Sequence, residues 1–212
     1  EYMPSSGSGL QPESAMVVMD PYTGDVLGLV GGKGEKIINL GTNRATQAVR
    51  PPGSAIKPVT VYAPALDAGI ITYGSVIDDT PLYFEETANG GTDPYPHNYP
   101  VTYRGLTTIH SAIARSVNTV SLKTLSELTV ERSFAFAHDK LHIHSLIDSI
   151  TRSNGTTITD KGLAALGLGQ LNYGLTVEEI TAAYCIFQNN GVYNTPNLYL
   201  YVTDSSDNMV LN

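Results

Sequence analysis

The sequence predicts an α+β fold in which helices dominate and strands lie mainly near the two ends of the chain. Short runs of β-forming residues lie at 15–20 and 25–30, and again close to the C-terminus. Helical spacing of apolar residues fills much of the sequence after Thr107. With 212 residues, the chain is long enough to bury a sizeable core as one large domain or two small ones.

The composition is that of a soluble globular protein and excludes several classes. Hydrophobic residues make up 42% and charged residues 15%, which argues against disorder. The net charge of −8 argues against a nucleic-acid partner, because a phosphate backbone needs a basic face. No apolar run approaches the length of a membrane span, and no signal peptide is recognisable. Cys185 excludes an internal disulfide and is expected to be a buried structural thiol.

The first half of the chain is expected to contain a linker, a hairpin and a helix. Residues 1–14 are rich in Ser, Gly and Pro and are interpreted as a linker. The runs at 15–20 and 25–30 flank a Pro- and Gly-containing turn and predict a β-hairpin. The segment 54–68 predicts a buried helix closed by Gly69. Residues 78–105 form a long irregular stretch, and loops of this length are usually functional.

The second half is expected to be mainly helical. Apolar faces predict helices on either side of the tripeptide 116–118, and a third helix over 130–142. Thr176 and Glu179 form a capping box that opens a helix ending at Asn190-Gly191. The tail from Asn197 to Leu211 predicts two strands about a polar turn.

The candidate chemistry begins with Ser54 and Lys57, three residues apart. On a helix this spacing places both side chains on one face, one turn apart. A serine hydroxyl is a poor nucleophile until its proton is removed, and a desolvated lysine can accept that proton. Chance alone gives roughly 0.45 such pairs in a chain of this composition. On spacing alone, therefore, a solvent-exposed Ser–Lys pair on a first helical turn remains the better interpretation.

The surroundings of the pair favour the catalytic interpretation. Three ordered blocks between about residues 15 and 202 resemble the transpeptidase domain of class A (bifunctional) penicillin-binding proteins. The blocks are Arg50-Pro51-Pro52-Gly53-Ser54-Ala55-Ile56-Lys57-Pro58, then Ala112-Ile113-Ala114-Arg115-Ser116-Val117-Asn118-Thr119, and then Ala164-Ala165-Leu166-Gly167-Leu168-Gly169-Gln170 with the segments that follow it.

The resemblance implies a fold and a reaction. The fold would be the layered α/β transpeptidase fold shared with β-lactamases, here residues 15–212 as mostly its helical portion with an N-terminal hairpin and an incomplete central sheet. Ser54 would attack D-Ala-D-Ala of a peptidoglycan stem peptide, Lys57 would take its proton, Ser116 would relay it, and Asn118 would bind the peptide. β-Lactam antibiotics would acylate the same serine. No metal or organic cofactor is implied, and the full-length protein would be membrane-anchored and extracytoplasmic.

Two further matches to the family's motifs are rejected. Ser206-Asp207-Asn208 also has the Ser-x-Asn pattern, but it falls in the turn expected in the C-terminal strand pair. The Lys-Thr-Gly motif is absent, because Lys123-Thr124 is followed by Leu125 inside a predicted helix. We therefore expect the chain to stop before the family's domain does. Either the C-terminal remainder of the same protein completes the sheet as a second polypeptide, or the strand edges are exposed and this chain alone is expected to be inactive and to label with penicillin hardly at all.

Other patterns carry less weight. His138 and His142 have a spacing that can bind zinc, but surface histidines at a helix end, with His144 off their face, are the preferred interpretation. The glycine-rich segment 31–34 is interpreted as a loop rather than a phosphate site. Four tyrosines could line a groove or simply pack over the core: Tyr83, Tyr95, Tyr99 and Tyr103.

Two alternative functions stay open. A D,D-carboxypeptidase or β-lactamase would use the same Ser–Lys chemistry with water as acceptor, and an acceptor assay would distinguish it. A non-catalytic penicillin-sensing or scaffold domain would acylate slowly or never. The absent third motif keeps this second alternative open.

Overall fold

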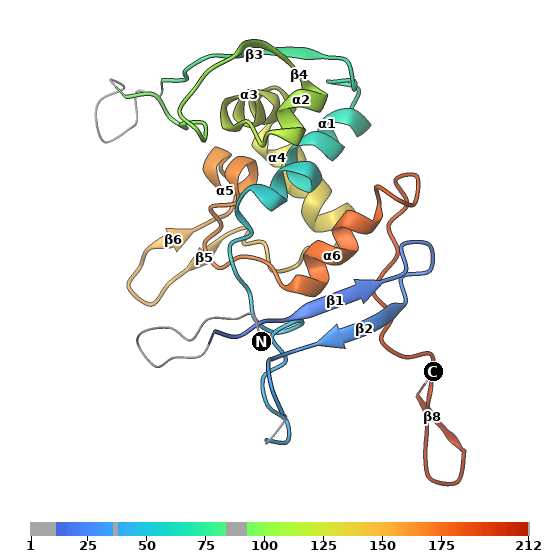
Figure 1. Cartoon of the computed structure of the whole chain (residues 1–212). Helices are drawn as coiled ribbons and strands as arrows, with labels where there is room; N and C mark the ends of the chain where they lie inside the picture. Colours follow the sequence, from blue (N-terminus) through green and yellow to red (C-terminus); the bar gives the residue numbers. More distant parts are fainter. Residues whose placement is uncertain (1–11, 36–37, 84–92, 212) are drawn as a thin grey trace. The chain divides into compact units, whose positions relative to one another are not determined.

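A computed structural model describes residues 12–35, 38–83 and 93–211, and the chain divides into two compact units (Figure 1). The first unit joins the residues up to Arg50 with those from Leu175 onward, and the second runs from Pro51 to Gly174. Most of the predicted linker, residues 1–11, lies outside the described residues. The assignment of residues 15–212 to one domain stays a prediction.

The first unit is built on the predicted N-terminal hairpin. Strand β1 (Met16–Met19) pairs antiparallel with β2 (Val26–Val30), and Gly24 takes the positive φ of +83° that their turn requires. Helix α6 (Val177–Cys185) packs against β1 (Figure 1). The hairpin prediction is confirmed.

Helix α6 begins at the predicted capping box. Thr176 Oγ1 accepts a hydrogen bond from Glu179 N at 3.1 Å, and Glu179 Oε2 accepts one from Thr176 N at 2.9 Å. The two reciprocal bonds satisfy backbone donors that the first turn leaves unpaired. The helix ends at Cys185, earlier than expected, and turns occupy residues 186–191.

The C-terminal tail forms the second predicted strand pair. Strands β7 (Val202–Thr203) and β8 (Met209–Leu211) are antiparallel, and Asp204 Oδ1 accepts from the backbone N–H groups of Ser206 and Asn208 in the turn between them. The interpretation of the Ser206 tripeptide as a turn is confirmed.

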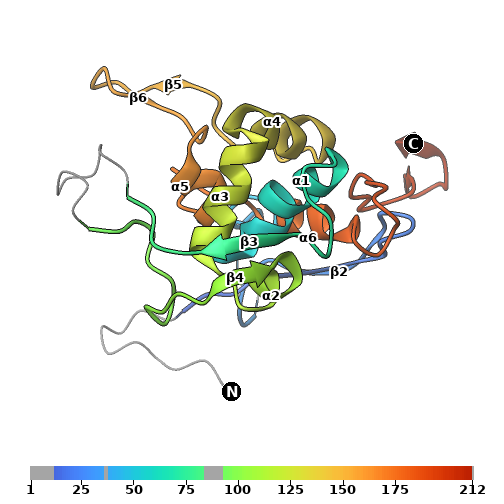
Figure 2. The same cartoon turned by 90° about the horizontal axis from the view of Figure 1, so that it is seen from above.

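The second unit is mainly helical and has α3 at its centre. Helix α3 (Asn118–Leu128) contacts α1, α2, α4 and α5, which surround it in Figure 2. Its Leu122, Leu125 and Leu128 side chains are almost completely buried. The other helical segments are η1 (Gly53–Ile56), η2 (Pro58–Tyr62), α1 (Ala63–Asp67), α2 (Ile109–Ala114), α4 (Val130–Ala135), η3 (Phe136–Lys140) and α5 (Leu163–Leu168).

The segment predicted as one helix over 54–68 is helical as far as Asp67 but changes type along its length. A 3₁₀ turn (η1) passes into a π-helical stretch at Pro58, and regular α-helix begins at Ala63, directly before Pro64. A proline lacks the N–H that would continue the i→i−4 ladder, so a change of helix type at such positions is expected.

Buried hydroxyl groups join these helices to α5. Thr60 Oγ1 donates to Leu166 O at 2.6 Å, and Ser121 Oγ donates to Gly167 O at 2.8 Å. Both side chains are fully buried, where an unpaired hydroxyl is costly, so each bond fixes the position of one helix against the next.

The expectation that strands lie mainly at the two ends was wrong. Strand β3 (Val76–Asp79) pairs with β4 (Gly105–Thr108), and the short strands β5 (Ile150–Thr151) and β6 (Thr157–Ile158) form another pair. In sequence, β3 and β4 flank the long irregular stretch, of which residues 84–92 lie outside the described part. Their pairing spans 25 residues, and the two aspartates that end β3 disfavour strands locally, so no short-range signal identified it.

Gly169 permits α5 to end against the turn that carries Ser54. It has a φ of +75°, and a Cβ built on it would lie 2.6 Å from Gly53 Cα and closer still to Gly53 O. Gly155 has a similar φ of +81° in the β5–β6 turn, but a Cβ there would meet nothing within 4 Å.

We therefore expect Gly169→Ala to destabilise the chain far more than Gly155→Ala. The Gly155 variant should lose about 1 kcal/mol of the free energy of unfolding from backbone strain alone. The Gly169 variant should lose at least about 3 kcal/mol, because backbone atoms cannot move aside as a side chain does. Urea unfolding of both variants measures the difference, and equal losses would contradict the close backbone contact.

Candidate active site

Ser54 is presented on a short, anchored turn. It lies in η1, where its residue is exposed while the neighbouring Ile56 is fully buried. Gly53 precedes it with a φ of +56°, a conformation that favours glycine. The turn thus exposes Ser54 to solvent, while the buried side chain of Ile56 anchors the same turn in the core.

Lys57 follows one turn later and is buried. Its side chain is among the largest fully enclosed in the described chain, although the residue carries an amine. Lys57 Nζ donates to Ser116 O at 2.8 Å, to Ser116 Oγ at 3.1 Å and to Asn118 Oδ1 at 2.5 Å. Residues 59 to 61 positions apart in sequence are therefore in direct contact.

Burial also changes the acidity of this amine. Desolvation penalises the charged form and lowers the pKa of Lys57 to about 8. A lysine with this pKa is partly neutral near physiological pH, and a neutral amine has a lone pair that can accept a proton. The site therefore contains a potential base.

Ser116 occupies a strained connection between α2 and α3. Its φ is +54°, and Ser116 N and Val117 N donate to the carbonyls of Ile113 and Ala112. This is the Schellman arrangement that ends a helix, in which glycine is the usual residue at the left-handed position. A serine at that position costs conformational energy and places a hydroxyl group beside Lys57.

Asn118 is held by both ends of its amide. Oδ1 accepts from Lys57, and Nδ2 donates to His97 O at 2.7 Å. Its backbone N–H donates to Asn98 Oδ1 at 2.9 Å, and Asn98 in turn donates to the buried carboxylate of Asp79 at 2.7 Å. Sequence patterns did not indicate Asp79 or Asn98, since both lie in or beside the irregular stretch, where no periodicity exists to interpret.

A cavity of about 310 Å³ opens beside this connection. It is lined by Asp79, Asn98, Tyr99, Pro100, Thr102, Arg104, Arg115, Ser116 and Val117. Ser116 therefore faces both a buried amine and an adjoining hollow.

Three of the four predicted site residues are joined directly: Lys57, Ser116 and Asn118. In the described part of the chain no hydrogen bond joins Ser54 Oγ to Lys57 Nζ, so that contact stays a prediction. Lys123 and Thr124 lie within α3, as expected, and Thr124 Oγ1 donates to Val120 O there.

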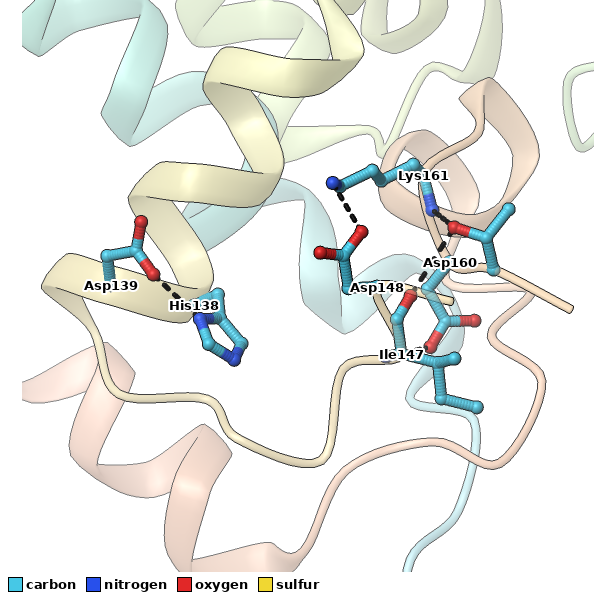
Figure 3. Close-up of polar contacts among 7 residues, drawn as sticks. His138, Asp139, Ile147, Asp148, Asp160 and Lys161 are labelled. Atoms are coloured by element: carbon cyan, nitrogen blue, oxygen red, sulfur yellow. Dashed lines mark hydrogen bonds and ion pairs between the residues drawn. The ribbon is translucent and has the colours of Figure 1, made fainter. Parts of the chain in front are cut away.

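The histidines form a ring cluster rather than a pair. His138 bonds to Asp139 at 2.7 Å and lies apart from the Lys161–Asp148 ion pair (Figure 3). The expectation that His144 lies off their face was wrong: its ring centroid is 5.4 Å from that of His138 and 5.6 Å from that of His142. His142 has a φ of +51°, which turns the chain back. Over residues 12–35, 38–83 and 93–211, no group of three or more His, Cys, Asp or Glu residues could hold a metal ion.

Cys185 does not resemble a nucleophile. It is half-buried rather than buried, because it lies at the end of α6. Desolvation, with a smaller effect of Asp20, raises the pKa of its thiol. A reactive cysteine needs the opposite shift.

Comparison with known proteins identifies the family. The family described as the penicillin-binding protein transpeptidase domain matches residues 14–212. Penicillin-binding protein 1A of Clostridium acetobutylicum is 34% identical over 208 residues, which cover 95% of this chain and 24% of that protein. Penicillin-binding protein 1F of Bacillus subtilis is 32% identical over 191 residues, covering 90% and 23%. The chain belongs to the penicillin-binding protein transpeptidase family, and it spans about a quarter of the length of these relatives.

Solved structures share the fold. The crystal structure of penicillin-binding protein 1A from Haemophilus influenzae matches with a TM-score of 0.73 at 23% identity, covering 99% of this chain and 29% of that one. PonA1 from Mycobacterium tuberculosis, in complex with penicillin V, matches at 0.68 and 23%, covering 94% and 50%. Penicillin-binding protein A from M. tuberculosis, as an imipenem acyl-enzyme, matches at 0.70 and 18%, covering 97% and 52%. The α+β fold class and its assignment to this fold family are confirmed.

Within the described residues, no helix combines the length and the apolar character needed to cross a membrane.

The lowered pKa of Lys57 predicts a pH-dependent stability. Unfolding exposes the amine and restores its ordinary pKa near 10.5, so between about pH 8 and 10.5 the unfolded chain binds more protons than the folded one. Stability from this residue should therefore rise with pH across that window. Urea unfolding from pH 7.5 to 9.5, compared with Lys57→Met, isolates the effect: the free energy of unfolding should rise in the unmodified chain relative to the variant. Parallel curves would contradict the buried, deprotonating amine.

Proposed function

We propose that this chain carries the Ser–Lys centre of a peptidoglycan D,D-transpeptidase that is also acylated by β-lactam antibiotics. The observation that carries the proposal is the buried Lys57 amine, hydrogen-bonded to both Ser116 and Asn118 and one turn after an exposed serine. Surface Ser–Lys pairs have no such partners, so the solvent-exposed interpretation of the spacing no longer applies.

In the first half of the reaction, Ser54 Oγ attacks the carbonyl carbon of the penultimate D-Ala in a stem peptide. The neutral Lys57 amine takes the hydroxyl proton as the new C–O bond forms. The C–N bond to the terminal D-Ala breaks, and its nitrogen receives a proton from the Ser116 hydroxyl, which is replenished by Lys57 at 3.1 Å. Free D-Ala leaves, and the donor peptide remains as an ester of Ser54.

In the second half, an amine of a neighbouring stem peptide attacks this ester. Its proton passes to the Ser116–Lys57 pair, the C–O bond breaks, and a cross-linking amide forms while Ser54 recovers its hydroxyl. A β-lactam would be attacked at its ring carbonyl in the same way. The ring nitrogen stays attached to the acyl group, and a stable acyl-enzyme results.

The environment of Lys57 supports a role as proton carrier. Burial favours the neutral amine, and the Ser116 hydroxyl lies within hydrogen-bond distance to give or take the proton. Asn118 orients the amine through Oδ1, and its second Nδ2 proton, beyond the one given to His97 O, is available to bind a peptide carbonyl. The roles of Ser54, Lys57, Ser116 and Asn118 are those that the family resemblance implies.

Two alternatives remain within reach of experiment. A D,D-carboxypeptidase or β-lactamase would release the acyl group to water, so product analysis with and without an added amine acceptor distinguishes them. A penicillin-sensing domain would form the acyl-enzyme without turning over peptide.

We further propose that the protein works outside the cytoplasmic membrane, where stem peptides are cross-linked. Completion of the sheet by the C-terminal remainder stays a prediction.

Covalent labelling with a fluorescent penicillin, measured with the C-terminal remainder of the domain present, tests the nucleophile. Ser54→Ala should abolish labelling, because the other hydroxyl one turn from Lys57, that of Thr60, is fully buried and donates to Leu166 O. Ser206→Ala is the matched control: it removes the serine of the second Ser-x-Asn tripeptide, which lies in the β7–β8 turn, and labelling should be unchanged. Labelling that survives in the Ser54 variant would place the nucleophile elsewhere.

Ser116→Gly separates stability from function at the strained connection. Glycine adopts a φ near +54° without penalty, so this variant should be as stable as the unmodified chain or about 1 kcal/mol more stable. Labelling should nevertheless fall at least about 100-fold, since the proton relay is lost. Ser116→Ala, which removes the hydroxyl but keeps the backbone strain, should show the same loss of labelling and be less stable than Ser116→Gly. Normal labelling of either variant would exclude Ser116 from proton transfer.

A further inference from the structure

We infer that Asn98 is a positioning residue: from a distant loop, its side chain caps helix α3 and thereby holds the Ser116–Asn118 tripeptide against Lys57. The inference rests on the proposed function only for its catalytic consequence. The cap itself is a structural feature that can be tested separately.

Helix α3 lacks a cap of its own. Its N-cap residue is Val117, which has no side-chain hydrogen-bonding group, and no side-chain cap bond forms there. Helices α2, α4 and α6 each begin instead with a threonine whose hydroxyl accepts a backbone N–H of the first turn. The first N–H groups of any helix have no partner within it, so α3 needs an acceptor from elsewhere.

Asn98 supplies that acceptor. Its Oδ1 accepts from Asn118 N at 2.9 Å and from Thr119 N at 3.3 Å, across about 20 residues of sequence. Both donors lie in the first turn of α3. One buried amide oxygen therefore performs from a distance what a local Ser or Thr does for the other helices.

Asp79 fixes the orientation of the Asn98 amide. Asn98 Nδ2 donates to Asp79 Oδ1 at 2.7 Å and to Thr102 O at 3.1 Å. The carboxylate, only 1% exposed, also accepts from Thr119 Oγ1 at 2.5 Å and from Arg104 N at 3.0 Å. Since a carboxylate can only accept, the amide must turn its NH₂ toward Asp79 and its oxygen toward α3. Every polar atom of the Asn98 side chain thus has a partner.

The cap leads directly to the candidate active site. The backbone N–H of Asn118 donates to Asn98 Oδ1, and its side-chain Nδ2 donates to the carbonyl of His97, the residue directly before Asn98. Its Oδ1 then meets Lys57 Nζ at 2.5 Å. A shift of the first turn of α3 would move an oxygen that holds the amine, and displacements of about 1 Å can cost a hundredfold in rate.

Amide hydrogen exchange tests the cap without reference to any activity. In Asn98→Ala, the Asn118 and Thr119 amides should exchange roughly 2- to 30-fold faster than the loss of global stability accounts for. Asn172→Ala is the matched control: Asn172 Nδ2 likewise donates to a buried carboxylate, that of Asp160, at 2.8 Å, and to the Thr159 carbonyl, but it caps no helix. Asp160 Oδ2 accepts a hydrogen bond from Ile147 N at 2.9 Å (Figure 3). Unchanged local exchange in Asn98→Ala would overturn the inference.

Penicillin labelling tests the catalytic consequence. At a temperature equally far below each variant's melting point, Asn98→Ala should label at least about tenfold more slowly than the unmodified chain. Asn172→Ala should remain within about twofold. Equal losses in the two variants, or faster local exchange with unchanged labelling, would overturn the positioning role.

An exchange of the two polar residues provides the rescue. Asn98→Asp keeps the oxygen for α3 but sets a second carboxylate against Asp79, so it should label slowly as well. Combining it with Asp79→Asn restores the bond between the two side chains in reversed order, although Thr102 O loses its donor. The double variant should therefore label faster than Asn98→Asp but more slowly than the unmodified chain. A double variant no better than Asn98→Asp would contradict the pairing. If the unmodified chain fails to label even with the C-terminal remainder present, the proposed function fails, and hydrogen exchange alone decides whether the cap exists.

Discussion

The buried amine of Lys57 is the interaction on which the second unit depends. An amine removed from water is unfavourable unless it is hydrogen-bonded or gives up its charge, and here burial is accompanied by both three oxygen partners and a lowered pKa. All three oxygens belong to Ser116 and Asn118. The chain can bury this amine only if the turn after Ser54 and the α2–α3 connection meet, so packing and the candidate chemistry impose the same requirement.

The surrounding helices meet this requirement with polar bonds as well as apolar packing. Buried hydroxyls of Thr60 and Ser121 bond to carbonyls of α5, and Gly169 lets the end of that helix rest on the backbone of Gly53. Directional bonds and backbone contacts fix positions more closely than apolar packing alone. Conformational energy is spent at Ser116, where a left-handed backbone brings a hydroxyl to the amine. The site is thus strained locally and supported from three helices.

Much of this protein was predictable from sequence wherever the signal is local. The N-terminal hairpin has a Pro- and Gly-containing turn between two β-forming runs, and α6 has a capping box; both depend on residues within about five positions. The Ser54–Lys57 spacing was visible but weak alone, and it gained meaning only through the ordered blocks around it. The strand pair β3–β4 was missed because 25 residues separate the two strands and because Asp78 and Asp79 disfavour strands.

The sequence by itself determined the local elements, the family and the residue types available for chemistry. Tertiary structure alone decided which of those residues meet. Nothing near Lys57 in sequence indicates that its amine binds oxygens about 60 positions away, and nothing near Val117 indicates that Asn98 caps its helix. Ser116 has a left-handed φ that no local pattern of a serine predicts. The physical reason is the same in each case: buried polar groups must find partners, and in a folded chain these partners are chosen by proximity in space, which periodicity and spacing do not encode.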